Sequence, residues 1–116
     1  MKYEEIVAKA KEIMSNKDVS NYNNHLAVQI NVTGDGEGVF YIEIADGKIN
    51  VEPYDYNDND CILSCSADNL IKIVSGSLDP VLAFTTGKLK INGSIEKALE
   101  FQKIISSVKS TAKKKK

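Results

Sequence analysis

Residues 26–53 read LAVQINVTGDGEGVFYIEIADGKINVEP, and this stretch decides the fold class. Apolar and polar side chains alternate on both sides of a glycine-rich turn at 34–38, which predicts two strands with one apolar face each. Asp46-Gly47 is a strong hairpin signal and predicts a third strand. The stretch therefore predicts an antiparallel meander with one apolar and one polar face, its strands at 26–33, 39–45 and 48–53.

Helices and further strands flank the meander on both sides. Before it, apolar residues recur at three- and four-residue steps over 2–15, which predicts an amphipathic helix. After it, Ser66 and Ser94 are expected to cap helices, and Asp79-Pro80 to begin a short one. The expected later elements are a strand at 60–66, a helix at 67–75, a short helix from Pro80 to before Gly87, a strand at 88–92 and a helix at about 95–110. The sequence therefore predicts an α+β domain whose helices gather over one face of the sheet.

Length and charge exclude several classes of protein. The 116 residues suffice for one domain, no apolar run approaches the roughly 20 residues of a transmembrane helix, and the N-terminus has no secretory signal pattern. Residues 1–112 hold 11 lysines against 16 acids and no arginine, a net charge of −5, whereas residues 113–116 are all lysine. Residues 1–112 therefore lack the clustered basic face of a nucleic-acid-binding protein. We expect a monomeric domain over residues 1–110 that binds no nucleic acid, and a disordered lysine-rich tail at 111–116.

No set of side chains has the spacing of a catalytic or metal site. His25 has no cysteine or carboxylate partner at ligand or triad spacing. Cys61 and Cys65 share one face of a strand about 13 Å apart, which excludes a disulfide or a shared metal. The turn at 34–38 lacks the helix and Lys-Ser/Thr pair of a phosphate loop, and residues 55–60 lack the Gly and Glu of a calcium loop. We therefore expect no metal, no cofactor, no catalytic residues, and a chain that is not an enzyme on its own.

Apolar surface is the feature that remains. The helical segments after residue 67 are apolar along one side, and each strand supplies an apolar face. These faces either fill an ordinary core or line, in part, a ligand site, and periodicity alone does not distinguish the two.

The chain resembles the sterol carrier protein 2 family over roughly residues 4–108. The segments that carry the resemblance are VQINVTG at 28–34, FYIE at 40–43, DGK at 46–48 and, above all, AFTTGKLKING at 83–93, with Ser66, Leu70, Val74, Gly76 and Pro80 in the family's order. The resemblance implies a mixed five-stranded sheet with helices covering one face and a hydrophobic tunnel between sheet and helices. It also implies a lipid ligand (a fatty acid, a fatty acyl-CoA or a sterol), held with loose selectivity.

The resemblance also suggests which residues contact the ligand. Gln102 lies where the last helix of the family often carries a glutamine at the tunnel mouth, and we expect it to contact a polar head group. Burying a sixteen-carbon chain contributes about 12 kcal/mol before the costs of association, which predicts micromolar affinity or tighter. The apolar lining is expected from Val28, Ile30, Phe40, Ile42, Leu70, Val74, Leu82, Phe84, Leu89, Ile91, Phe101 and Ile105.

The resemblance leaves two alternative functions and one question of location. An accessory protein that binds an isoprenoid quinone precursor is one alternative, and an electrostatic membrane-interaction module without a specific lipid is the other. The peroxisomal members of the family end in a tripeptide like Ser-Lys-Leu, whereas this chain ends in four lysines. We therefore expect a cytoplasmic protein, with a peroxisomal location reached by another route as the alternative. Near an anionic membrane each lysine contributes about 1 kcal/mol, which predicts transient membrane contact through Lys113, Lys114, Lys115 and Lys116.

Overall fold

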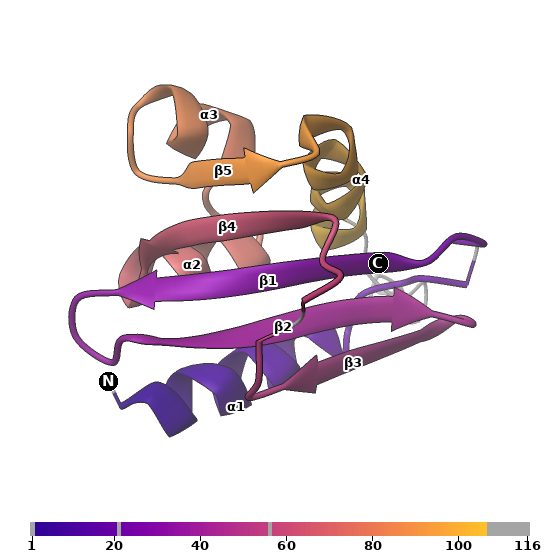
Figure 1. Cartoon of the computed structure of the whole chain (residues 1–116), viewed down its shortest axis with the longest axis horizontal. Helices are drawn as coiled ribbons and strands as arrows, with labels where there is room; N and C mark the ends of the chain where they lie inside the picture. The colour runs from indigo at the N-terminus through magenta and orange to yellow at the C-terminus, as the bar shows by residue number, and fades with distance from the viewer. Residues whose placement is uncertain (1, 21, 56, 107–116) are drawn as a thin grey trace, which may run out of the picture.

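A five-stranded sheet runs through the computed structural model, which describes residues 2–20, 22–55 and 57–106, and helices cover one of its faces (Figure 1). The predicted α+β architecture is therefore confirmed. Along the chain the elements are α1 (Tyr3–Met14), β1 (Leu26–Thr33), β2 (Gly38–Ala45), β3 (Lys48–Glu52), β4 (Cys61–Ser66), α2 (Ala67–Val74), α3 (Pro80–Thr85), β5 (Lys90–Gly93) and α4 (Ile95–Ser106).

The strands lie in the order β3-β2-β1-β4-β5, with β1 at the centre. β1 pairs antiparallel with β2 and parallel with β4, and the remaining pairs are antiparallel, so the sheet is mixed as predicted. Asp46 and Gly47 form the two-residue turn between β2 and β3, with φ of 55° and 73°. Positive φ at both positions defines the hairpin turn that Asp-Gly favours, which explains why this dipeptide fixed the register of β3.

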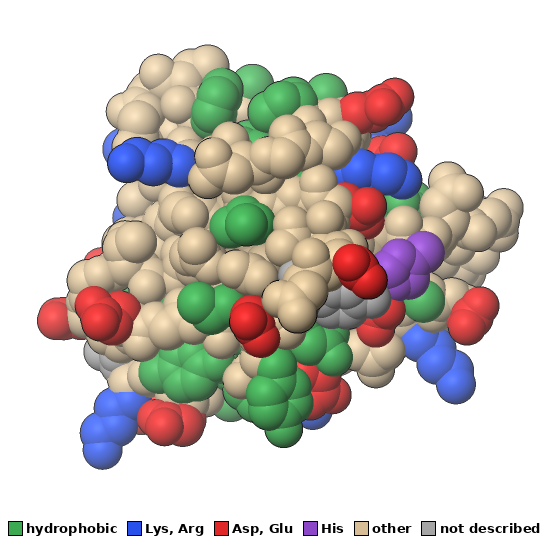
Figure 2. All heavy atoms as spheres, viewed as in Figure 1, with side chains coloured by type: hydrophobic (Ala, Val, Ile, Leu, Met, Phe, Trp, Pro, Cys, Tyr) green, Lys and Arg blue, Asp and Glu red, His purple; other side chains and the backbone are tan. Residues whose placement is uncertain are grey.

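The core fills the space between the sheet and the helices. Along β2 the even-numbered side chains are buried and the odd-numbered ones are not, which is the alternation that the sequence predicts. Against this inner face pack the fully buried Ile6 of α1, Leu70 of α2 and Phe101 of α4. The opposite face of the sheet carries mainly polar side chains, and Figure 2 looks onto it.

The later elements differ from the prediction at their ends. β5 begins at Lys90 and not at Lys88, because the backbone N–H groups of Lys88 and Leu89 donate to the carbonyl of Ala83 and so close the end of α3. β5 ends at Gly93, one residue beyond the expected end at residue 92, and Gly93 pairs with Cys61. The expected continuation of the last helix to residue 110 and the tail at 111–116 lie outside the described residues.

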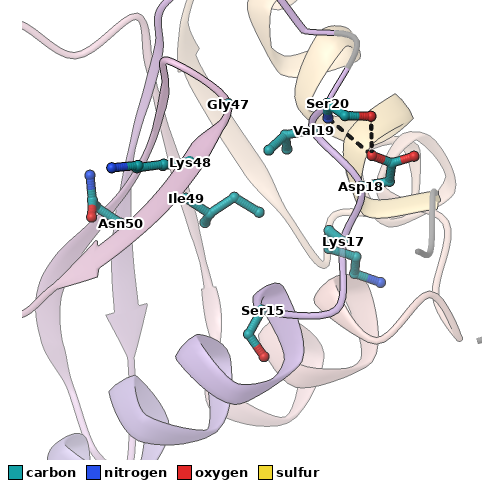
Figure 3. A pocket seen from close by; sticks show the side chains of 9 residues that line it. All are labelled: Ser15, Lys17, Asp18, Val19, Ser20, Gly47, Lys48, Ile49 and Asn50. Atoms are coloured by element: carbon teal, nitrogen blue, oxygen red, sulfur yellow. Dashed lines mark hydrogen bonds between the residues drawn. The ribbon is translucent and has the colours of Figure 1, made fainter. Parts of the chain in front are cut away.

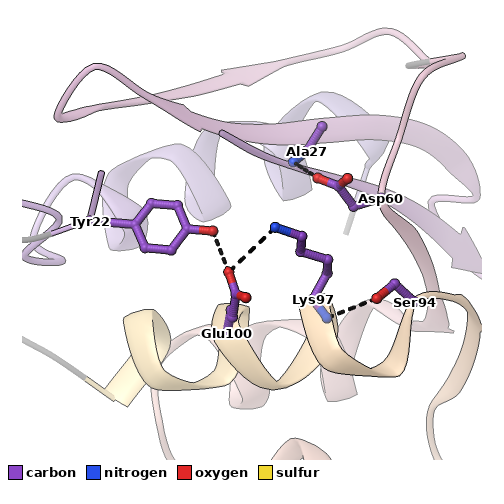
Figure 4. A network of polar contacts seen from close by, with 6 residues as sticks. All are labelled: Tyr22, Ala27, Asp60, Ser94, Lys97 and Glu100. Atoms are coloured by element: carbon purple, nitrogen blue, oxygen red, sulfur yellow. Dashed lines mark hydrogen bonds and ion pairs between the residues drawn. The ribbon is translucent and has the colours of Figure 1, made fainter. Parts of the chain in front are cut away.

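A set of polar contacts fixes α4 (Figure 4). Ser94 caps the helix, since its hydroxyl oxygen accepts from the backbone N–H of Lys97 at 3.1 Å. The Tyr22 hydroxyl, from the segment between α1 and β1, donates to the carboxylate of Glu100, and the Lys97 ammonium lies 3.7 Å from the same carboxylate. α4 is thus attached to a segment of the chain far from it in sequence.

Candidate functional site

An apolar cavity of about 100 Å³ lies between α3, α4 and the β4–β5 edge of the sheet. Among the described residues that line it, Gln102 alone brings polar side-chain atoms. The cavity is therefore a hydrocarbon-lined space with one amide at its wall. Its lining consists of Leu63, Pro80, Val81, Phe84, Leu89, Ile91, Ile95, Ala98, Leu99, Phe101 and Gln102.

Local sequence explains how α3 comes to form one wall. Asp79 caps the helix, because its Oδ1 accepts from the backbone N–H of Val81 at 2.8 Å, and Pro80 occupies the first helical position. Gly87, with φ of 82°, turns the chain back toward β5. Ala83 is the one fully buried side chain of this six-residue helix, so α3 places its larger apolar side chains around the cavity and on the surface.

The apolar wall of the cavity continues onto the surface. Five large apolar side chains of α3 and α4 are each more than 40% exposed, and we call them the apolar rim: Val81, Leu82, Phe84, Ile95 and Leu99. All of them except Leu82 also line the cavity. Hydrophobic side chains gather over α3 and the start of α4 in Figure 2, along its upper edge. Exposed apolar side chains that gather in one place are typical of interaction or ligand-entry surfaces.

A second, more polar hollow of about 210 Å³ adjoins the cavity. Gln102 stands between them, and its Nε2 donates to Oδ1 of Asp79 at 3.2 Å. The hydroxyl of Ser106, one turn further along α4, also lines the second hollow and donates to the carbonyl of Gln102 at 3.0 Å. The lining of the second hollow is Ile73, Gly76, Leu78, Asp79, Pro80, Gln102, Ile105 and Ser106.

The residues expected to line a tunnel separate into three groups. Phe84, Leu89, Ile91, Phe101 and Gln102 line the apolar cavity, and Ile105 lines the second hollow. Leu82 lies on the apolar rim outside both. The others are buried in the core cluster and border neither hollow, so a role for them in ligand contact stays a prediction: Val28, Ile30, Phe40, Ile42, Leu70 and Val74.

Six cavity residues were not among those expected. Leu63 points inward from β4 and pairs with Ile91 of β5, so the period-two pattern of β4 carried a signal for it. The residues of α4 recur at three- and four-residue steps on the side of the helix that bears Gln102, which was a second signal. The six are Leu63, Pro80, Val81, Ile95, Ala98 and Leu99.

A larger hollow of about 450 Å³ lies between the β2–β3 hairpin and the end of α1. Figure 3 shows that Val19 and Ile49 point toward one another across it, whereas Lys48 points away and the Lys17 ammonium extends to the other side of its own segment. Asp18 is engaged with Ser20, whose hydroxyl donates to it at 2.7 Å. The charged atoms do not converge there, so this hollow is a weaker candidate for a binding site than the apolar cavity.

The cysteine and histidine side chains, which could act as nucleophiles or bases, lie outside the apolar cavity. Burial raises the pKa of the thiols of Cys61 and Cys65 to about 11, with the carboxylate of Asp60 adding to the shift for Cys61. Nε2 of His25 lies 2.6 Å from Oε2 of Glu43, a pairing between segments that sequence spacing did not reveal.

In the described part of the chain, no group of three histidine, cysteine or carboxylate side chains is placed to hold a metal ion. Within the same residues, no helix has the length and apolar character needed to cross a membrane.

The fold and the cavity define a class of protein: a small α+β domain with an apolar cavity between one sheet edge and its helices. The chain belongs to the SCP-2 sterol transfer family, whose pattern matches residues 7–106. It is 32% identical over 85 residues to bovine (Bos taurus) hydroxysteroid dehydrogenase-like protein 2 and 31% identical over 71 residues to bovine sterol carrier protein 2. These alignments cover 71% and 61% of this chain, but only 20% and 13% of the two relatives.

The same fold occurs in a solved structure of sterol carrier protein 2 from Aedes aegypti in complex with palmitate, a sixteen-carbon fatty acid. The two chains are 22% identical, and the TM-score is 0.62 over 94% of this chain and 98% of the other. The likeness confirms the fold: a mixed sheet with helices on one face.

Proposed function

We propose that this protein binds a lipid in the apolar cavity and transfers it between membranes. The observation that carries the proposal is that the apolar rim continues into the cavity. A lipid can then move between the surface and the interior while its chain stays in contact with apolar side chains. Each buried methylene group contributes about 0.8 kcal/mol, so a lined hydrocarbon space favours long apolar chains over polar metabolites. Membership of the SCP-2 sterol transfer family supports the same function.

The ligand classes that we propose are fatty acids, fatty acyl-CoA and sterols. The palmitate complex of the mosquito relative supports the first of these. An isoprenoid quinone precursor is the alternative ligand, since its chain is equally apolar.

Binding of a displaceable fluorescent fatty acid tests the proposal. We expect one probe per chain, at micromolar affinity or tighter. Leu99→Asp should weaken binding at least tenfold, because Leu99 lines the cavity. Tyr54→Asp is the control, since Tyr54 is an exposed apolar side chain outside the rim and both hollows. Absence of saturable binding for every fatty acid, acyl-CoA, sterol and quinone precursor would overturn the proposal, as would equal effects of the two variants.

We further propose that the protein has no catalytic activity of its own. The described residues bring together no nucleophile with a base around the cavity, and Gln102 is not a group that exchanges protons at neutral pH. The stretch shared with the dehydrogenase-like relative is about one fifth of that protein, so the relative's name does not assign a dehydrogenase activity to this chain. Turnover of a thioester or steroid substrate by the purified protein, abolished by one polar substitution, contradicts this part of the proposal.

The proposed place of action is the surface of an anionic membrane facing the cytoplasm, reached by a monomer. The apolar rim supports membrane contact because it surrounds the cavity, and the sequence carries four lysines at 113–116, beyond α4. Acyl chains would meet the rim while the lysines attract anionic head groups. A net charge of −5 over residues 1–112 argues against nucleic acid as a partner.

A further inference from the structure

The apolar cavity and the second hollow share two lining residues, of which Gln102 has the flexible side chain. Pro80 and Gln102 line both spaces, and Pro80 is fixed at the start of α3. The side chain of Gln102 is held by its hydrogen bond to Asp79. Its torsions are free to change once that bond breaks. The contact joins two residues at a solvent-accessible site, where water can replace either partner. Of the two shared residues, Gln102 is therefore the one whose side chain can change position.

The volumes of the two hollows show what a movement of Gln102 would achieve. The hollows measure about 100 and 210 Å³, each below the roughly 300 Å³ at which ordinary ligand pockets begin. Joined, they reach that lower limit. A ligand with a long chain thus needs both spaces, and Gln102 must turn aside for the chain to extend from the cavity into the second hollow.

The two spaces also differ in chemistry. The cavity offers hydrocarbon, whereas the second hollow offers the carboxylate of Asp79, the amide of Gln102 and the hydroxyl of Ser106. Among the described residues that line either space there is no lysine and no histidine. A fatty acid carboxylate placed in the second hollow would face Asp79 without a positive partner, while a hydroxyl group would donate to Asp79 and accept from the amide of Gln102.

We propose that the two hollows are the two ends of a single lipid site, that Gln102 opens and closes the passage between them, and that Asp79 selects a hydroxyl head group over a free carboxylate. The ligand class is thus a long-chain alcohol or a sterol with its hydroxyl beside Asp79. The inference rests on the proposed function, which it narrows to one kind of polar end.

Asp79→Asn tests the head-group part, with dodecanol and dodecanoate as probes at pH 8. Asparagine caps a helix as well as aspartate does, so α3 is kept while the charge is removed. We expect Asp79→Asn to tighten dodecanoate binding about fivefold, the size of a partly exposed charge interaction, and to leave dodecanol unchanged. Raising the salt concentration should shrink the difference. Asp68→Asn, in the first turn of α2 and outside both hollows, is the control and should change neither. Unchanged dodecanoate binding in Asp79→Asn overturns the role of Asp79.

Gln102→Phe tests the passage. A bulky apolar side chain at this position cannot turn aside without losing its own burial, so it closes the passage while adding no charge. In the wild-type protein, the affinity for alcohols of 6 to 14 carbons should rise about fourfold per methylene until the joined space is full. In Gln102→Phe the affinity should stop rising at a shorter alcohol than in the wild-type protein. In Gln102→Ala it should stop rising at the same chain length as in the wild-type protein. The same limiting length in all three proteins overturns the passage but leaves lipid binding intact, whereas absence of binding to any alcohol or acid removes the proposed function itself.

Discussion

The hydroxyl group of Tyr22 donates a hydrogen bond to the carboxylate of Glu100, although 78 residues separate them along the chain. Tyr22 belongs to the segment between α1 and β1, and Glu100 lies in the middle of α4, which forms one wall of the cavity. The contact therefore ties the beginning of the chain to the helix that carries Gln102. Burial, with the hydrogen bond to Glu100 as the second cause, raises the pKa of Tyr22 well above its usual range.

Tyr22→Phe should lower the free energy of unfolding by about 1–2 kcal/mol, because a hydrogen bond to a charged group is lost while the ring stays. Urea denaturation followed by circular dichroism measures the change. Tyr54→Phe serves as the control, since Tyr54 is 63% exposed, and its effect should stay within about 0.5 kcal/mol. An equal effect of the two substitutions would mean that the contact with Glu100 contributes nothing to stability.

The two buried cysteines predict resistance to alkylation. With a pKa of about 11, roughly one thiol in a thousand is ionised at pH 8, and the buried sulfur atoms are closed to reagent. Iodoacetamide should leave the native protein unmodified and add two groups to the protein in urea, as read by intact mass. Rapid double labelling of the native protein at pH 8 contradicts the burial of these side chains.

The same thiols give a pH dependence of stability. Their pKa is raised in the folded state from the ordinary 9.0, so the folded protein retains protons that the unfolded chain releases. The stability they contribute is complete below pH 9 and is lost as the pH rises from about 9 to about 11. Urea midpoints measured across this interval should fall steadily, and midpoints that hold to pH 11 would refute the assignment.

Gly93 and Gly87 form a matched pair of glycines with positive φ, of 96° and 82°. A Cβ atom at Gly93 would lie 2.9 Å from the carbonyl oxygen of Asp60 and 3.0 Å from Cα of Cys61, whereas one at Gly87 meets nothing within 4 Å. Gly87→Ala should therefore cost about 1–2 kcal/mol from backbone strain alone, and Gly93→Ala clearly more, because backbone atoms must also move. Equal unfolding free energies for the two variants would show that the sheet edge accommodates the added atom.

Removal of residues 113–116 tests membrane contact. Four lysines supply at most about 4 kcal/mol near an anionic surface, so the truncated protein should transfer lipid more slowly to anionic vesicles at low salt. Transfer to neutral vesicles and lipid affinity in solution should not change, and added salt should abolish the difference between the two proteins. Identical transfer to anionic vesicles at low salt would assign the lysines no role in docking.

Much of the fold could be predicted because its signals are local. Alternation along residues 26–33 and 39–45 gave the two strands, and Asp46-Gly47 gave the turn between β2 and β3. The start of β5 could not be predicted in this way. The carbonyl of Ala83 accepts from the N–H groups of Lys88 and Leu89, so these groups are not available for strand pairing. This contact joins α3 to the residues before β5, and a local sequence pattern does not reveal it.

The site was less accessible to prediction than the fold. Period two shows that Ile30 and Leu63 both point inward, but not that Ile30 is covered by the core while Leu63 borders a cavity. Which part of the inner face stays open depends on where the helices pack, and α3 and α4 leave the apolar cavity near β5. Ile95 and Leu99 look like core residues by their spacing, yet they are partly exposed, because within residues 2–106 no further element covers that side of α4.

The parallel pairing of β1 with β4 divides the folding of this chain into an early and a late stage. β2 reaches β1, and β3 reaches β2, through short turns. β4 can join β1 only after the intervening residues 34–60 have looped back, which is a slower search. Leu63 and Ile91 arrive with β4 and β5, so the space for a ligand is the last part of the molecule to form. A nascent chain that pauses before β4 presents β1 as a bare sheet edge, open to pairing with a neighbour's strand. The central strand therefore makes the newly synthesised protein dependent on prompt completion of its own C-terminal half.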